Sequence, residues 1–157
     1  MITIRKADRN DFDSIRSLRS QLHKMHCQAR PDIYRDCDPL TAPEYKEMLK
    51  NKGKVVLVAV DSDTGEVVGF ADASLKRVKG RSELCDRCTM YIDAVCVDER
   101  RRSQGIGKKL FEAVKQLAKK SGAQSLELMV WEFNRSAFDF YTKEGMNVRS
   151  MTLEEKL

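Results

Sequence analysis

The length, composition and charge of the chain exclude several classes of protein. Its 157 residues, 41% of them hydrophobic, suit one compact domain with a single core. A net charge of +5 favours an anionic partner, but 29 basic residues against 24 acidic ones are too balanced to predict binding to nucleic acid. No apolar run could span a membrane and no secretion signal opens the chain, so we expect a cytoplasmic protein without a membrane partner.

The first half of the chain predicts a strand, two helices and a hairpin. The helical spacing of apolar residues predicts the helices, and turn residues such as "DSDTG" predict the hairpin. A segment rich in prolines and acids, residues 26–43, separates the two helices. The elements are, in order, a strand over 2–5, helices over 12–25 and 44–50, and strands over 54–61 and 66–75.

The second half alternates strands and helices after a charged loop over residues 76–87. The order of elements favours an α/β fold with a mixed sheet flanked by helices. The elements are a strand over 89–97, a helix over 105–121, a strand over 125–130, a helix over 134–143 and a strand over 146–153.

The segment "RRRSQGIGKKL", residues 100–110, predicts an anion site. A strand that turns directly into a helix leaves backbone N–H groups unpaired, and Gly105 and Gly107 let an anion approach them. Basic side chains surround this turn, namely Arg101, Arg102, Lys108 and Lys109. The spacing fits neither a Walker A loop nor a dinucleotide fingerprint. The alternative is that the glycines only allow a tight turn and the arginines are solvated.

Two motifs resemble those of the GNAT superfamily of N-acetyltransferases. "RSQGIG" (102–107) is similar to the signature whose amides hold the pyrophosphate of acetyl-CoA, and "NRSAFDFYTKEGM" (134–146) is similar to the family's later helix, with Met146 in place of a phenylalanine. The resemblance implies a mostly antiparallel six-stranded sheet with about four helices and a splay between the strands near 89–97 and 125–130. It also implies one domain over 1–157, with an acceptor-side half (1–88) and an acetyl-CoA-binding half (89–157).

The resemblance also implies which residues bind and react. The acetyl-CoA-binding residues would be Val95, Cys96, Val97, Arg102, Ser103, Gln104, Gly105, Ile106, Gly107, Lys108, Asn134, Ala137 and Tyr141. Main-chain N–H groups around 94–97 would face the reacting thioester, and Cys96 would contribute only its amide. Asn134 has a second interpretation as a simple helix N-cap, and both roles can coexist.

Tyr141 and Asp93 are the candidate catalytic residues. The family assigns this tyrosine to the departing sulfur, and a phenol stays protonated at neutral pH; the alternative is packing in the core. Asp93 lies two residues after Tyr91 and so on the same strand face, where a carboxylate can deprotonate the amine through a water. Its alternative is a structural hydrogen bond. Glu132 and His26 are further candidates for the base.

Several alternatives remain beside an acetyl-CoA-dependent N-acetyltransferase of a small-molecule or protein amine. The donor could be another acyl-CoA, or the chain could be a CoA-binding regulatory module without turnover. A zinc site built on Cys85 and Cys88 with Cys27, Cys37, His23 or His26 is a weak pattern, and five cysteines, an odd number, favour reduced thiols. We expect no metal. A short C-terminal end leaves a sheet edge open, which favours a homodimer.

Overall fold

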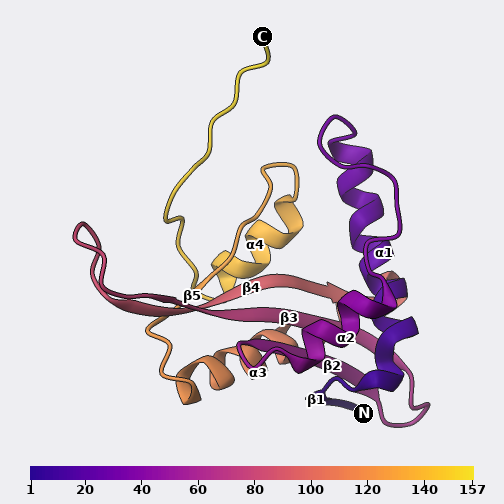
Figure 1. Cartoon of the computed structure of the whole chain (residues 1–157). Helices are drawn as coiled ribbons and strands as arrows, with labels where there is room; N and C mark the ends of the chain where they lie inside the picture. The colour runs from indigo at the N-terminus through magenta and orange to yellow at the C-terminus, as the bar shows by residue number, and fades with distance from the viewer.

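A five-stranded mixed sheet forms the centre of the molecule in this computed structural model, which describes residues 1–157 (Figure 1). The strands lie in sequence order, with three antiparallel pairings and a parallel pairing between β4 and β5. They are β1 (Ile2–Lys6), β2 (Lys54–Asp61), β3 (Val67–Val78), β4 (Arg87–Val97) and β5 (Ser125–Glu127).

Four α-helices cover the two faces of this sheet. They are α1 (Phe12–Ala29), α2 (Ala42–Lys50), α3 (Ile106–Lys120) and α4 (Arg135–Lys143). Alternation along β2 builds two cores: Val56 and Val58 pack with α1 and α2, whereas Leu57 and Ala59 pack with α3. Gly69 of β3 lets α3 approach closely, because a Cβ there would lie 3.2 Å from Leu110.

Local capping explains where two helices begin. Thr41 and Glu44 form a capping box at α2, with a proline in its first turn. A second box joins Asp8 and Asp11 ahead of α1. Arg5 of β1 donates to the nearly buried carboxylate of Asp11 at 2.7 Å and 2.8 Å, and this contact fixes the entry of α1 against the sheet.

Two irregularities in β4 open the sheet. Asp72 of β3 pairs with Ala94 and Ala73 pairs with Ile92, so Asp93 is the extra residue of a β-bulge. On its other side β4 pairs with β5 only over Thr89–Tyr91. The remainder of β4 therefore has no strand neighbour on that side, which is the predicted splay.

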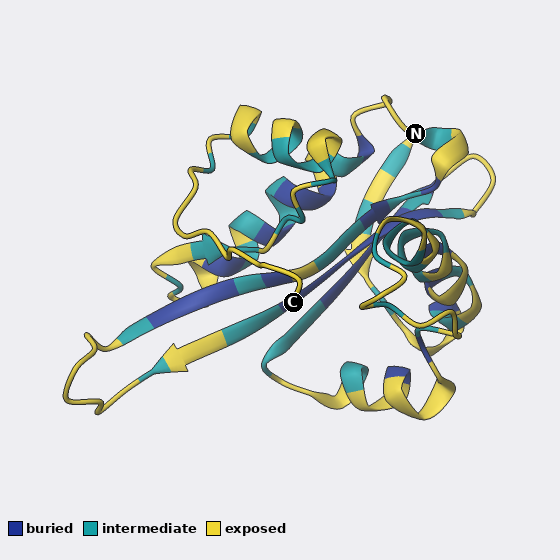
Figure 2. Cartoon of the chain, turned by 90° about the horizontal axis from the view of Figure 1, so that it is seen from above, coloured by how far each residue is buried: buried dark blue, intermediate teal, exposed yellow.

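The predicted sixth strand over 146–153 is wrong. The residues after α4 have no regular structure and extend away from the sheet (Figure 1), and from residue 147 onward they are exposed (Figure 2). A strand needs a partner for its backbone, and this segment finds none within the chain. Ion pairs hold it instead, from Arg149 to Glu127 (2.5 Å) and from Glu154 to Arg30 (2.7 Å). The predicted strand over 125–130 is also shorter, because β5 ends at Glu127.

None of the helices combines the length and the apolar character that crossing a bilayer requires.

Candidate acetyl-CoA-binding and catalytic site

The turn between β4 and α3 presents a run of backbone N–H groups without a partner in the protein. Gly105 is the N-cap of α3 and has a left-handed φ of 76°, and Ser103 has a φ of 63°. No backbone N–H from Arg102 to Lys108 donates to an acceptor in the chain, whereas that of Lys109 donates to the carbonyl of Gly105 at 3.1 Å. Such consecutive free donors at a helix start can bind a phosphate group.

The three arginines before this turn have different surroundings. Arg100 and Arg101 are held by carboxylates, at 2.7 Å from Asp98 and 2.6 Å from Asp61. Arg102 is exposed and has no carboxylate partner, although its Nε donates to a backbone carbonyl at 3.4 Å. Arg101 is thus engaged in the fold, contrary to its expected place around the anion, and Arg102 is available to a ligand.

The charges at the start of α3 suit a bound anion. The positive end of a helix dipole favours acidic residues, yet the first turn of α3 has none. Lys108 and Lys109 stand there instead; Nζ of Lys108 lies 3.4 Å from Glu144, and Nζ of Lys109 donates to the carbonyl of Ile2 at 3.3 Å. Cations at this end of a helix are unfavourable unless negative charge is close. Glu144 supplies it for Lys108, whereas Lys109 has no carboxylate partner, and a phosphate would supply that charge.

Helix α4 packs against the same turn and carries the second motif. Asn134 is its N-cap, with the side-chain oxygen accepting from the N–H of Ala137 at 3.2 Å, so the capping interpretation is confirmed. The side-chain NH2 group of Asn134 makes no hydrogen bond within the chain and can still serve a ligand. A Cβ on Gly107 would lie 3.8 Å from the Phe140 ring, which brings the two motifs into contact.

Tyr141 packs among aromatic rings and keeps its hydroxyl free. Its ring centroid lies 5.8 Å from that of Phe111 and 5.0 Å from that of Phe140. The hydroxyl makes no hydrogen bond in the chain and is not sealed from solvent. Burial raises the pKa of Tyr141 to about 12, so the phenol is protonated at neutral pH and can donate a hydrogen bond to a thiolate.

The open edge of β4 contains the other residues that the resemblance implies. Val95, Cys96 and Val97 follow the last residue paired with β5, so this edge can accept an extended ligand. The thiol of Cys96 is buried and donates to the carbonyl of Leu18 at 3.3 Å. Burial raises its pKa to about 11, so it stays protonated and only its backbone is available.

Asp93 is held by two donors on the α1 and α2 face of the sheet. Its Oδ2 accepts from Oγ of Ser74 at 2.6 Å and from Nζ of Lys54 at 3.1 Å. The ring of Tyr91 lies 3.8 Å from Nζ of Lys76. Because Ser74 and Lys76 are two residues apart on β3, Asp93 and Tyr91 share one face, as their spacing predicts.

The other candidate bases lie beside an aromatic cluster. His26 stacks on Tyr34, with ring centroids 4.9 Å apart, and meets the edge of Phe133. Burial, followed by the charge of His23, lowers the pKa of His26, so its imidazole is neutral at pH 7. Glu132 is exposed and makes no ion pair. The structure thus places His26 in a packed cluster and Glu132 in solvent.

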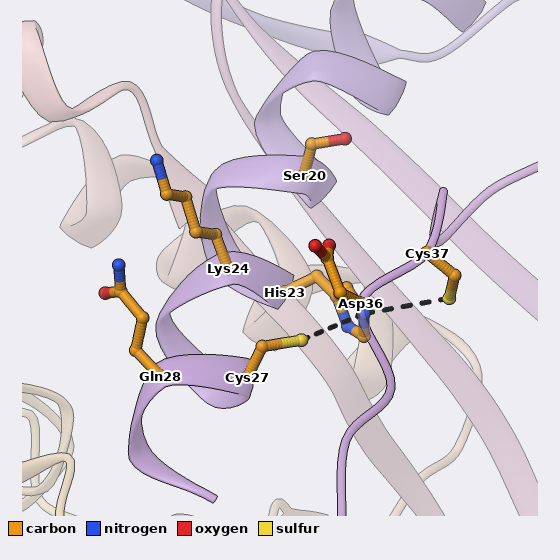
Figure 3. Close-up of a pocket in the computed structure, with 7 residues that line it drawn as sticks. All are labelled: Ser20, His23, Lys24, Cys27, Gln28, Asp36 and Cys37. Carbon is orange, nitrogen blue, oxygen red and sulfur yellow. Dashed lines mark hydrogen bonds between the residues drawn. The ribbon is translucent and has the colours of Figure 1, made fainter. Parts of the chain in front are cut away.

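A cavity of about 570 Å³ lies beside α1 and contains some of the sulfur atoms considered as zinc ligands (Figure 3). Nε2 of His23 lies 3.3 Å from the thiol of Cys27 and 3.8 Å from that of Cys37. The same nitrogen donates to the carbonyl of Arg35 at 2.7 Å. No three His, Cys, Asp or Glu side chains are grouped so as to hold a metal ion.

Sequence reasoning missed the residues that hold Asp93. Lys54 comes from β2 and Ser74 from β3, and Lys54 also binds the buried Asp72. The one signal for these contacts is an aspartate inside the apolar strand "VVGFADASL", because a buried charge needs a partner.

The site as a whole suits a long ligand that carries a phosphate group. The free amides lie at one end of the site, and the open edge of β4 follows them. The phenol of Tyr141 lies on the face of the sheet that α3 covers, and the carboxylate of Asp93 lies on the opposite face, which α1 and α2 cover. This arrangement suits acyl transfer from an extended donor.

Comparisons with known proteins show that the fold is shared with solved structures. A mutant of the BH1408 protein from Bacillus halodurans is 31% identical over 99% of both chains, with a TM-score of 0.96. The aminoglycoside N-acetyltransferase AAC(6')-Iy, solved with CoA, has a TM-score of 0.78 at 19% identity, over all of this chain and 95% of that one. Glucosamine-6-phosphate N-acetyltransferase from Arabidopsis thaliana has a TM-score of 0.68 at 20% identity, and the match covers 99% of this chain and 98% of that one.

No curated protein matches the sequence. The model of the Acetyltransferase (GNAT) family matches residues 19–146, most of the chain and both motifs up to Met146. The chain belongs to the GNAT family of acetyltransferases.

Proposed function

We propose that the chain is an N-acetyltransferase that transfers the acetyl group of acetyl-CoA to a primary amine of a small molecule or a protein. The observation that carries this proposal is the run of unpartnered backbone N–H groups from Arg102 to Lys108, which opens α3 beside the splayed strand. A pyrophosphate there would satisfy donors that the protein leaves free.

The proposed reaction needs no covalent intermediate on the protein, because a thioester is activated toward a neutral amine. Asp93 takes the proton of the ammonium, directly or through a water, and the backbone around 95–97 donates to the carbonyl oxygen as it gains charge. As the C–S bond breaks, Tyr141 donates a hydrogen bond to the sulfur, and the departing thiolate takes the second proton that the nitrogen loses when it becomes an amide. Its pKa of about 12 makes it a hydrogen-bond donor to the thiolate rather than a strong acid.

Residues 1–88 would then bind the acceptor and residues 89–157 the acetyl-CoA. The fold neighbours include proteins named for aminoglycoside and glucosamine-6-phosphate acetylation. We therefore propose amino sugars as the first acceptor class to test, followed by polyamines, amino acids and peptides.

A homodimer is part of the proposal. β5 has β4 as its one strand neighbour, and Val148, Met151 and Leu153 of the C-terminal segment are exposed apolar residues. A second subunit that covers them would remove both features. Sedimentation equilibrium should give about twice the mass of 18.0 kDa at micromolar concentration. A monomer at all concentrations would contradict the dimer.

Isothermal titration with acetyl-CoA, CoA and ATP tests the donor site. We expect saturable binding of both CoA species and little binding of ATP. Release of free thiol in the presence of amines then tests turnover. Binding without thiol release for any amine would favour a CoA-binding regulatory module, and faster release from a longer acyl-CoA would favour another donor.

A further inference from the structure

A carboxylate with no exposure to solvent lies in the middle of the sheet next to the bulge. Asp72 of β3 is 0% exposed. Its Oδ2 accepts from the guanidinium of Arg19 in α1 at 2.6 Å, and its Oδ1 accepts from Nζ of Lys54 in β2 at 2.8 Å. A buried charge is tolerated only when it is paired and hydrogen-bonded, and here each oxygen has its own cation.

Lys54 does more than neutralise this buried acid. Its Nζ also lies 3.1 Å from Oδ2 of Asp93, so one ammonium group bridges two carboxylates on neighbouring strands. The Lys54 side chain is 21% exposed, and Asp72 fixes where it points. A lysine on a flexible stem would otherwise lose conformational entropy to reach Asp93.

The two oxygens of Asp93 have different surroundings. Oδ2 accepts from both Ser74 and Lys54, whereas Oδ1 has no partner in the chain. The side chain is 30% exposed, so Oδ1 can meet a ligand or a water. The bulge places Asp93 outside the regular pairing of β3 and β4, and these two donors fix its direction.

We propose that Lys54, held by Asp72, is a positioning residue that turns the free oxygen of Asp93 toward the acceptor amine. Lys54 touches neither the donor turn nor the phenol and acts through Asp93. This inference rests on the proposed function, in which Asp93 receives the proton of the amine.

The test compares four single variants of the full chain and then repeats one of them in an Asp93→Asn background. Lys54→Met keeps the length of the side chain and removes its charge, and Lys54→Arg keeps the charge. Ser74→Ala removes the other donor to Asp93 and keeps both ion pairs of Asp72. It therefore tests the orientation of Asp93 even if Lys54→Met does not fold. Lys50→Met is the matched control, because Lys50 is an exposed lysine paired only with Glu47.

We expect Lys54→Met and Ser74→Ala each to lower kcat about tenfold, with the acetyl-CoA Kd within about twofold of the wild type. Lys54→Arg should recover most of the loss, and Lys50→Met should equal the wild type. In an Asp93→Asn background Lys54→Met should have no further effect, because both act through one carboxylate. An equal loss in that background, or no loss in the wild-type chain, would overturn the proposal.

A measurement without turnover separates this inference from the proposed function. The side-chain carboxyl ¹³C resonance of Asp93, identified by its loss in Asp93→Asn, should move at pH 7 in Lys54→Met and Ser74→Ala and stay in place in Lys50→Met. An unmoved resonance overturns the positioning role. A wild-type chain that binds acetyl-CoA and acetylates no amine would instead overturn the proposed function.

Discussion

At the scale of single residues, a substitution of Gly107 tests the proposed phosphate site. Its neighbour Gly105 has a positive φ, so any side chain there adds strain, whereas a Cβ on Gly107 meets only ordinary contacts at 3.8 Å. Gly107→Glu places an acid in the first turn of α3, which favours the helix but repels a pyrophosphate. We expect its acetyl-CoA Kd to rise at least about 100-fold, or about 2.7 kcal/mol, with no loss of thermal stability.

Gly107→Ala is the matched control, because a Cβ at this position meets only ordinary contacts and adds no charge. Titration calorimetry should give an affinity near that of the wild type. If Gly107→Glu binds acetyl-CoA as tightly as Gly107→Ala, the phosphate does not lie at this turn.

Tyr141→Phe tests the proposed hydrogen bond from the tyrosine to the departing sulfur. The ring contacts with Phe111 and Phe140 remain, so we expect stability and acetyl-CoA affinity to stay close to those of the wild type. Loss of a hydrogen bond made in the transition state should lower kcat about 10- to 100-fold, read as thiol release at saturating substrates. An unchanged kcat would remove Tyr141 from the mechanism.

At the scale of elements, the packing of α1 against the segment after β5 should make the free energy of unfolding depend on pH. Burial lowers the pKa of His26 from 6.5, so below that pH the unfolded chain binds a proton that the folded chain does not. The contribution of neutral His26 to stability is therefore fully present above about pH 6.5. It is lost as the pH falls from there toward the pKa of His26 in the folded chain. His26→Phe keeps an aromatic ring beside Tyr34 and should reduce this dependence, measured as urea unfolding at pH 7.5 and 5.5. An equal pH dependence in both proteins would contradict this origin.

At the scale of the whole molecule, donor binding should stabilise the fold. At 100 times its Kd a ligand that binds only the folded state adds about 2.7 kcal/mol. For a domain of this size that corresponds to a rise in Tm of roughly 5 to 10 °C. Thermal unfolding with acetyl-CoA, and with ATP as control, measures it. No rise with acetyl-CoA would contradict binding to the folded state.

Much of the fold and the geometry of the turn before α3 could be predicted because their signals are local. The start of α3 follows from Gly105 and the glycine-containing turn, and the start of α4 from the cap at Asn134. The unpaired amides follow from the same turn, since a helix start leaves its first N–H groups free whatever packs around it. The hairpin of β2 and β3 follows from alternating apolar residues and a short polar turn.

The tertiary structure alone decided the contacts between distant strands. The ammonium of Lys54 reaches Asp93 across 39 positions of sequence, and no spacing rule predicts a bulge at Asp93 or an ion pair with the buried Asp72. It also decided that residues 146–153 form no strand, because a strand depends on a partner that the segment itself does not contain. The helix starts and the turn with free backbone amides follow from the amino-acid sequence, because they depend on neighbouring residues. The orientation of Asp93 follows only from folding, because it depends on side chains that three strands bring together.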